Sequence, residues 1–192
     1  MKRKVIIGIS GASGAIYGIR ALQHLASLDD IESHLILSDS AKTTIALETD
    51  FEVDDVKALA DVVHRNDNIA ASIASGSFLG TSMAIMPCSI RTLSAVATCN
   101  ADSLLVRAAD VALKEQRKLV LVVRETPLHK GHLELMLRAA DYGATILPPM
   151  PAFYHDPKTI DDVVNHTVGK VFDCLEIEHD LYRRWGGPKA RD

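Results

Sequence analysis

The sequence predicts an α/β protein of the doubly wound type, a three-layer sandwich in which helices cover both faces of a mainly parallel sheet. Short apolar runs alternate with longer segments of helical periodicity along the chain. Three of the short runs are almost entirely apolar, and a strand that is apolar on both sides must be buried on both sides. That is the position of a strand in a parallel sheet between two layers of helices.

The expected elements follow one another in alternation. Strands are expected at residues 5–9, 34–37, 83–86, 119–123 and 144–147. Helices are expected at residues 15–27, 40–48, 53–61, 92–97, 103–115, 133–142 and 160–175. Because no repeat or Pro/Gly linker interrupts this order, residues 1–175 are expected to form one domain, and the charged segment 176–192 is expected to leave the core as a tail.

Composition narrows the class of protein. A length of 192 residues suits one domain with a sizeable core, and the net charge of -4 gives no electrostatic reason to expect nucleic-acid binding. No apolar stretch is long enough to span a membrane, and the N-terminus shows no signal-peptide pattern. Cys88, Cys99 and Cys174 are odd in number and widely spaced, which favours reduced thiols in the cytoplasm over disulfides or a zinc site.

The most informative local feature is the loop at residues 10–14, a Gly/Ser segment between the first apolar run and the first helical segment. Glycines let a ligand approach the backbone, while the free N–H groups and dipole of a helix N-terminus favour an anion. The spacing of Gly8, Gly11 and Gly14 matches neither the dinucleotide fingerprint nor a P-loop. We interpret the loop as a phosphate cradle, with a ligand-free βα turn as the alternative.

Polar residues also follow the other predicted strands, and ligands of doubly wound folds bind at the carboxyl ends of strands. Ser38 stands near the place of the ribose-binding acid of dinucleotide-binding proteins. It suits a ribityl or phosphate ligand, but a helix N-cap would also explain it. Ser89 and Thr92 have the same two interpretations, and Cys88 beside them is either a nucleophile or a buried structural thiol.

Charged residues lie where they could serve a phosphate-bearing substrate. Arg124 and Glu125 directly follow the fourth predicted strand, and Arg107 and Lys114 lie about two turns apart on one face of a helical segment. Arg would bind phosphate by bidentate contact and Lys as a point charge, with a solvated surface as the alternative. Glu48, at the end of the second predicted helix, is a candidate acid or base or an ordinary surface residue.

The proline-rich segment 148–155 is stiff and largely apolar. Proline fixes φ and cannot continue a helix. The segment would form one side of an apolar pocket closed by Tyr154. The alternative interpretation is a rigid surface loop without a ligand.

Seven motifs occur in order: Gly-Ile-Ser-Gly-Ala-Ser-Gly (8–14), Leu-Glu-Thr (47–49), Ala-Ser-Gly-Ser-Phe (74–78), Pro-Cys-Ser-Ile-Arg-Thr-Leu (87–93), Arg-Ala-Ala-Asp-Val-Ala-Leu-Lys-Glu (107–115), Val-Arg-Glu-Thr-Pro-Leu (123–128) and Pro-Ala-Phe-Tyr-His (151–155). Together they resemble the flavin prenyltransferases of the UbiX/Pad family over residues 4–175, and the tail resembles Pad-type members. The resemblance implies a Rossmann-like fold and transfer of the dimethylallyl group of dimethylallyl monophosphate to N5 and C6 of reduced FMN, without a metal. It also implies a homododecamer with sites at subunit contacts, and a UbiD-type decarboxylase as recipient of the prenyl-FMN, for either quinone biosynthesis or aromatic acid decarboxylation.

The same resemblance implies roles for individual residues. FMN would be contacted by Gly11, Ala12, Ser13, Ser38, Ser89, Ile90, Arg91, Thr92 and Arg124. The substrate phosphate would be bound by Tyr154 and Lys170, with Arg107, Lys114 and Arg124 nearby, some of them across a subunit boundary. The catalytic residues would be Ser13, Glu48 and Glu125 as proton carriers and Lys114 beside the leaving phosphate. Family members often carry Arg at the position of Lys170, so the charge is kept here and the bidentate fork is lost.

Two alternatives belong to other functional classes. A flavin-dependent cysteine decarboxylase would use a catalytic His after the second strand, and this chain has none between His34 and His64. A non-catalytic FMN-binding subunit of a decarboxylase complex would not need the cations or Glu48.

Overall fold

The computed structural model describes residues 2–187 and shows six strands in one sheet, in the order β3-β2-β1-β4-β5-β6. Each pair of neighbouring strands is parallel, so the sheet is wholly parallel where the sequence predicted a mainly parallel one. The strands are β1 (Arg3–Ile9), β2 (Ile31–Leu37), β3 (Val62–Arg65), β4 (Thr81–Cys88), β5 (Leu119–Val123) and β6 (Thr145–Ile146).

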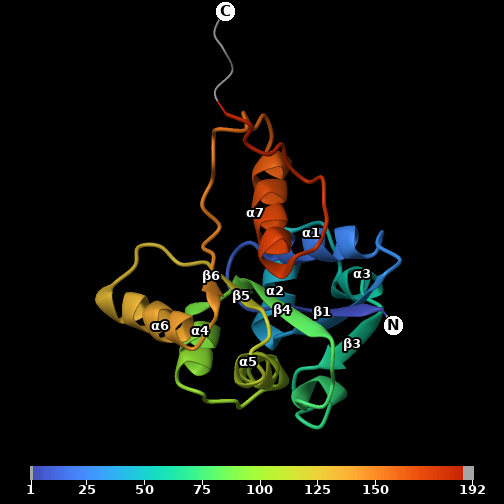
Figure 1. Cartoon of the computed structure of the whole chain (residues 1–192), viewed down its shortest axis with the longest axis vertical. Helices are drawn as coiled ribbons and strands as arrows, with labels where there is room; N and C mark the ends of the chain where they lie inside the picture. Colours follow the sequence, from blue (N-terminus) through green and yellow to red (C-terminus); the bar gives the residue numbers. More distant parts are fainter. Residues whose placement is uncertain (1, 188–192) are drawn as a thin grey trace, which may run out of the picture.

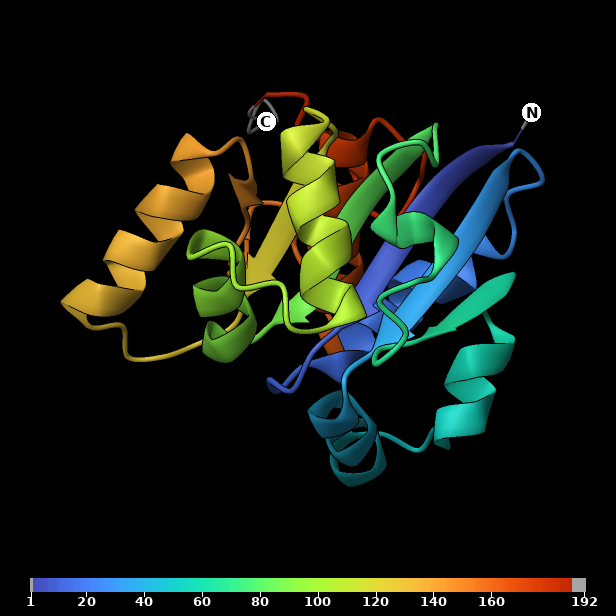
Figure 2. The same ribbon diagram turned by 90° about the horizontal axis from the view of Figure 1, so that it is seen from below.

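Helices cover both faces of the sheet, as predicted (Figures 1 and 2). One face carries α1 (Ala15–Leu25), α2 (Asp39–Glu48), α3 (Val53–Ala58) and α7 (Ile160–Leu175). The other carries α4 (Ile90–Ala97), α5 (Leu104–Lys114), α6 (Lys130–Asp141) and the 3₁₀ helix η1 (Ser72–Ala74). Within residues 2–187, no helix is long and apolar enough to cross a bilayer.

The central strand β1 serves both layers. Ile7 and Ile9 belong to the core beneath α1 and α7, whereas Ile6 belongs to the core beneath α4 and α5, because successive side chains of a strand point to opposite faces. Gly8 lies on the second face, where a Cβ atom would overlap the Leu105 side chain of α5. The apolar run and its glycine therefore set how closely the helices approach the sheet.

The structure contains one strand that the sequence did not predict. β3 forms the edge of the sheet, and its residues alternate between half-buried and exposed. An edge strand of four residues has no continuous apolar run to mark it, and the helix predicted at 53–61 ends at Ala58 to make room for it.

The prediction that the chain leaves the core after residue 175 is wrong for the first part of the tail. Glu176 adopts the left-handed conformation at φ 56°, and the N–H of Ile177 donates to the Phe172 carbonyl at 2.9 Å. This is a Schellman motif, which turns the chain back across the helix it ends. Ile177 is 5% exposed and remains in the core. Residues 188–192 of the predicted tail lie outside the described residues.

Two stacked histidines join β2 to the edge strand β3. His34 is 2% exposed, with its Nδ1 2.9 Å from Nε2 of His64 and its Nε2 2.9 Å from Oε1 of Glu32. Burial lowers the pKa of both histidines, and the Glu32 carboxylate opposes this shift at His34. The folded state therefore favours the neutral rings.

We expect stability to depend on these rings as pH falls. The unfolded chain takes up protons below about pH 6.5, whereas folded His34 and His64 resist them, so the free energy of unfolding is retained above that pH and declines below it. Urea unfolding at about pH 7.5 and 5.5 should show this decline, with a shallower decline for His34→Gln. An equal slope for variant and wild type would contradict the assignment.

Candidate functional site

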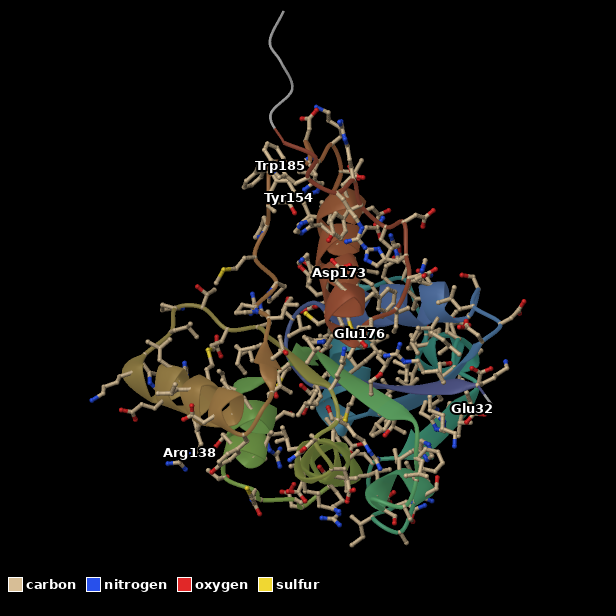
Figure 3. All side chains as sticks on the ribbon, viewed as in Figure 1. Glu32, Arg138, Tyr154, Asp173, Glu176 and Trp185 are labelled. Carbon is tan, nitrogen blue, oxygen red and sulfur yellow. The ribbon has the colours of Figure 1, made fainter. Side chains whose placement is uncertain are left out.

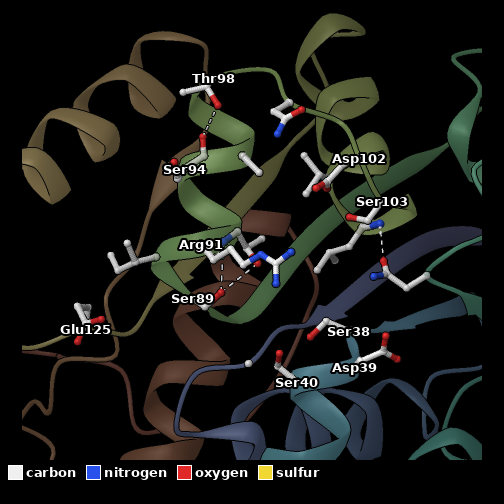
Figure 4. Close-up of a pocket in the computed structure, with 18 residues that line it drawn as sticks. Ser38, Asp39, Ser40, Ser89, Arg91, Ser94, Thr98, Asp102, Ser103 and Glu125 are labelled. Carbon is white, nitrogen blue, oxygen red and sulfur yellow. Dashed lines mark hydrogen bonds between the residues drawn. The ribbon is translucent and has the colours of Figure 1, made fainter.

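The strand order reverses between β1 and β4, and this is where doubly wound folds bind ligands. A cleft of about 660 Å³ opens at this edge of the sheet. Figure 4 shows Ser38 and Ser40, at the start of α2, on one side of the cleft and Ser89 and Arg91, at the start of α4, on the other. Its polar lining includes Gly11, Ser38, Asp39, Ser40, Asn66, Ser89, Arg91, Thr92, Asp102, Ser103 and Glu125.

Ser10 joins the two loops that bound this cleft, and the sequence did not single it out. Its hydroxyl donates to the Pro87 carbonyl at 2.9 Å and accepts from the Ser89 N–H at 2.8 Å, and the residue is 1% exposed. The loop after β1 is thereby fixed to the loop after β4. A serine directly after an all-apolar strand was the available signal.

The Ser10→Ala variant should lose stability and weaken binding in the cleft. Removing the hydroxyl leaves the half-buried Ser89 N–H without its acceptor, and losing the acceptor of a fully buried group costs about 1–3 kcal/mol. Chemical denaturation and titration with FMN measure the two effects. Wild-type stability in Ser10→Ala would show that the bridge is dispensable.

Glu48 reaches the glycine loop from the end of α2. Its Oε2 accepts a 2.8 Å hydrogen bond from the N–H of Gly14, which has a φ of 100° and begins α1. Glu48 is exposed, yet this bond holds its carboxylate at Gly14, the residue that follows Ser13 in the chain. The structure therefore places Glu48 at the loop that contains Ser13, the residue that the resemblance pairs with it as a proton carrier.

Ser38 and Ser89 are both helix caps. Ser38 Oγ accepts from the Ala41 N–H at 3.1 Å, and Ser89 Oγ accepts from the Thr92 N–H at 3.3 Å. The capping interpretation is thus correct for both, but it does not exclude a ligand at Ser38, because a hydroxyl that accepts a hydrogen bond can still donate one. Ser89 already donates to Thr92 Oγ1 at 3.1 Å. Both caps place helix N-termini at the cleft.

The residues around Arg124 connect the cleft to α7. The Arg124 N–H donates to the Cys88 carbonyl at 3.1 Å, and the Arg124 charge acts on the hydroxyl of Tyr17, which lies near Thr167 of α7. Burial raises the pKa of Tyr17, and the Arg124 charge opposes the shift. Glu125 lines the cleft. Cys88 is fully buried and burial raises its pKa, so it is the structural thiol and not a nucleophile.

Two predicted phosphate ligands do not reach the cleft of their own chain. Arg107 follows the cleft-lining Val106, but its side chain bonds to Asp110 at 2.7 Å and to the Ala74 carbonyl at 3.2 Å. Lys114 contacts Glu115 at the other end of α5, which lies beside the amino end of β5. The cleft is at the opposite, carboxyl edge of the sheet. These cations could serve such a cleft only in another copy of the chain.

Tyr154 also lies away from the cleft, at the end of α7 that is distant from the sheet (Figure 3). Its hydroxyl is 2.8 Å from Nε2 of His166, one turn of α7 before Lys170. Trp185 packs edge-on against Tyr154, with ring centroids 5.9 Å apart. A second cavity of about 470 Å³ opens there, lined by Tyr154, His155, Asp156, Arg183, Arg184, Trp185, Gly186 and Gly187. Trp185 was not among the predicted site residues, because only the return of the tail brings it there.

Among residues 2–187, no group of three or more His, Cys, Asp or Glu side chains is placed to hold a metal ion. A model of the flavoprotein family matches residues 1–172. The chain is 57% identical to the flavin prenyltransferase UbiX of Escherichia coli strain K12 over 187 residues, which are 96% of this chain and 99% of that protein. The chain belongs to the UbiX family of flavin prenyltransferases. UbiX of Thauera aromatica is also 57% identical, over 98% of this chain and 97% of that protein.

Solved structures agree with this membership. An AnUbiX (PadA1) structure in complex with FMN and dimethylallyl pyrophosphate has a TM-score of 0.96 at 42% identity, over 98% of this chain and all of that chain. A dodecameric FMN-dependent UbiX-like decarboxylase from Escherichia coli O157:H7 has a TM-score of 0.94 at 50% identity, over 96% of this chain and all of that chain. The peptidyl-cysteine decarboxylase EpiD, at 15% identity and a TM-score of 0.65, shares the fold alone.

Proposed function

We propose that the protein transfers the dimethylallyl group of dimethylallyl monophosphate to N5 and C6 of reduced FMN. The observation that carries this proposal is the near-complete agreement with the AnUbiX structure, whose ligands are FMN and dimethylallyl pyrophosphate. Monophosphate as the donor rests on the resemblance of the sequence to its family.

The cleft at the carboxyl edge of the sheet fits FMN. Its hydroxyls and the N–H groups at the starts of α2 and α4 suit a ribityl phosphate, and Arg91 adds a positive charge. Gly11 keeps the loop free of a side chain where it meets Ser40. We assign the predicted FMN contacts in and beside this cleft: Gly11, Ala12, Ser13, Ser38, Ser89, Ile90, Arg91, Thr92 and Arg124.

The reaction forms two bonds to the flavin. In the first, the allylic carbon bonds to N5 as its bond to the phosphate oxygen breaks, the phosphate leaves with the electron pair, and the N5 proton goes to a base. In the second, the CH carbon of the alkene takes up a proton, and the alkene carbon that carries the two methyl groups bonds to C6 of the flavin. The C6 proton is then lost. The protein must therefore both give and take protons at the flavin.

Glu48 is the proposed base at the flavin, because its carboxylate is held at the loop by Gly14 beside Ser13. Glu125, which lines the cleft, is the second proton carrier. Arg124 and Lys170 would stabilise the charge that develops on the leaving phosphate, with Tyr154 as a hydrogen-bond donor.

The complete site would be built from more than one copy of the chain. Arg107, Lys114 and Tyr154 do not line the cleft of their own chain, and the UbiX-like decarboxylase from Escherichia coli O157:H7 is dodecameric. A homododecamer would place these residues of one copy at the cleft of another. A UbiD-type decarboxylase is the proposed recipient of the prenyl-FMN.

Anaerobic incubation with reduced FMN and either dimethylallyl monophosphate or diphosphate tests the function. We expect release of phosphate from the monophosphate and a flavin that has gained one five-carbon unit. FMN that is bound but unchanged in mass with both donors would instead support a non-catalytic FMN-binding subunit.

A further inference from the structure

We propose that Asp173 of α7 is a positioning residue that anchors the returning tail and thereby holds Trp185 against Tyr154. The inference that this anchor affects binding of the prenyl phosphate rests on the proposed function, whereas the anchoring of the tail does not. Asp173 lies in the last turn of α7, and Figure 3 shows Trp185 and Tyr154 together beyond the other end of the helix.

One carboxylate receives three side chains of the tail. Asp173 Oδ2 accepts from the Tyr182 hydroxyl at 2.5 Å, while Oδ1 accepts from Arg184 Nη2 at 2.8 Å and His179 Nε2 at 3.1 Å. Lys170 Nζ, on the same helix, lies 3.4 Å from Oδ2. The two oxygens of a carboxylate offer about four acceptor positions, so these four donors saturate it.

The protonation states agree with this arrangement. Partial burial would raise the pKa of Asp173, but the bonds from Tyr182, Arg184 and His179 outweigh it and hold that pKa well below its usual range. Burial and the nearby carboxylate raise the pKa of Tyr182 to about 12, so its hydroxyl remains a donor. The anchor is therefore charged and intact across the neutral range.

The surface of α7 is shaped for the tail independently of these bonds. Gly169 lies one turn before Asp173, and a Cβ atom there would come within 2.5 Å of the Tyr182 ring and 2.7 Å of the His179 ring. The Tyr182 ring also packs on His166 at 4.7 Å between centroids. His166 in turn bonds to Tyr154 at 2.8 Å. Tail, helix and Tyr154 thus form one continuous contact.

This contact sets the wall of the second cavity. Arg184 is bound to Asp173 and lines the cavity next to Trp185. Lys170, a proposed ligand of the substrate phosphate, touches the same carboxylate. Asp173 therefore positions an aromatic wall and a cation together, and its loss should weaken binding of the prenyl phosphate more than binding of FMN, whose cleft is elsewhere.

Trp185 is the single tryptophan of the chain, so its fluorescence reports on the tail directly. The Asp173→Asn variant keeps the side-chain shape and removes the charge. We expect acrylamide to quench Trp185 at least about twofold more strongly in this variant, because it weakens three charge-assisted hydrogen bonds at once. Tyr182→Phe removes one of these three bonds and should have an intermediate effect. The matched control is Asp161→Asn, an acidic residue in the first turn of the same helix that pairs with Arg20. It should leave quenching unchanged.

The second experiment measures the steady-state kinetics of the same variants at saturating FMN. Loss of charged hydrogen bonds of about 1.5–3 kcal/mol corresponds to about a 10- to 100-fold rise in KM for dimethylallyl monophosphate, with a smaller change in kcat. Wild-type quenching in both Asp173→Asn and Tyr182→Phe would overturn the anchor. Stronger quenching with an unchanged KM would overturn the positioning role. If the wild type transfers no prenyl group, the proposed function fails, and the quenching comparison still decides the anchor.

Discussion

The Glu48→Gln variant is expected to bind FMN as the wild type does and to lose prenylation by about 100- to 10,000-fold, the usual contribution of a general acid or base. Gln keeps an oxygen that can accept the 2.8 Å hydrogen bond from Gly14, so the loop should keep its conformation. It cannot accept a proton from the flavin ring, which the second bond requires.

FMN affinity and single-turnover rates, measured together, separate the two roles of Glu48. The control is Glu134→Gln on α6, whose exposed pair with Lys130 should contribute little. A parallel loss of FMN affinity and turnover in Glu48→Gln would assign Glu48 to loop structure alone. Unchanged turnover would remove it from the mechanism.

The Gly11→Ala variant is expected to bind FMN about 5- to 150-fold more weakly. A Cβ atom at residue 11 would overlap the Cβ of Ser40 at the start of α2, and relieving such overpacking costs about 1–3 kcal/mol. The overlap would push apart the loop after β1 and the start of α2, which form one side of the cleft. Both FMN affinity and protein stability should therefore fall.

A second substitution tests this explanation. Ser40→Gly removes the atom that the new methyl group would meet, so the Gly11→Ala, Ser40→Gly double variant should recover part of the lost FMN affinity. Isothermal titration of the single and double variants with FMN gives the comparison. Equal affinities of Gly11→Ala and wild type would show that the loop can move without cost, and a double variant no better than Gly11→Ala would reject overlap with Ser40 as the cause.

The local part of the site could be predicted from sequence because it depends on short-range patterns. The apolar run at residues 5–9 marks β1, and the serines that follow the strands mark helix starts at one edge of a parallel sheet. Capping and ligand binding require the same residue types at Ser38 and Ser89, so sequence left both interpretations open, and the structure shows that capping occurs.

The remainder depends on contacts between distant parts of the chain. Ser10 acts through Pro87 and Ser89, and the tail returns because Glu176 adopts a left-handed conformation and Ile177 is apolar. Neither contact has a periodic pattern in the sequence. Lys114 shows a further limit, because it does not line the cleft of its own chain, and the proposal that it serves the cleft of another copy depends on contacts between chains.

The most direct test of the proposed chemistry uses reduced FMN that carries deuterium at C6, incubated anaerobically with the protein and dimethylallyl monophosphate. We expect a flavin product that has gained one five-carbon unit and lost the deuterium, as mass spectrometry would show. A product that retains the deuterium would contradict bond formation at C6, and a flavin of unchanged mass would contradict prenyl transfer altogether.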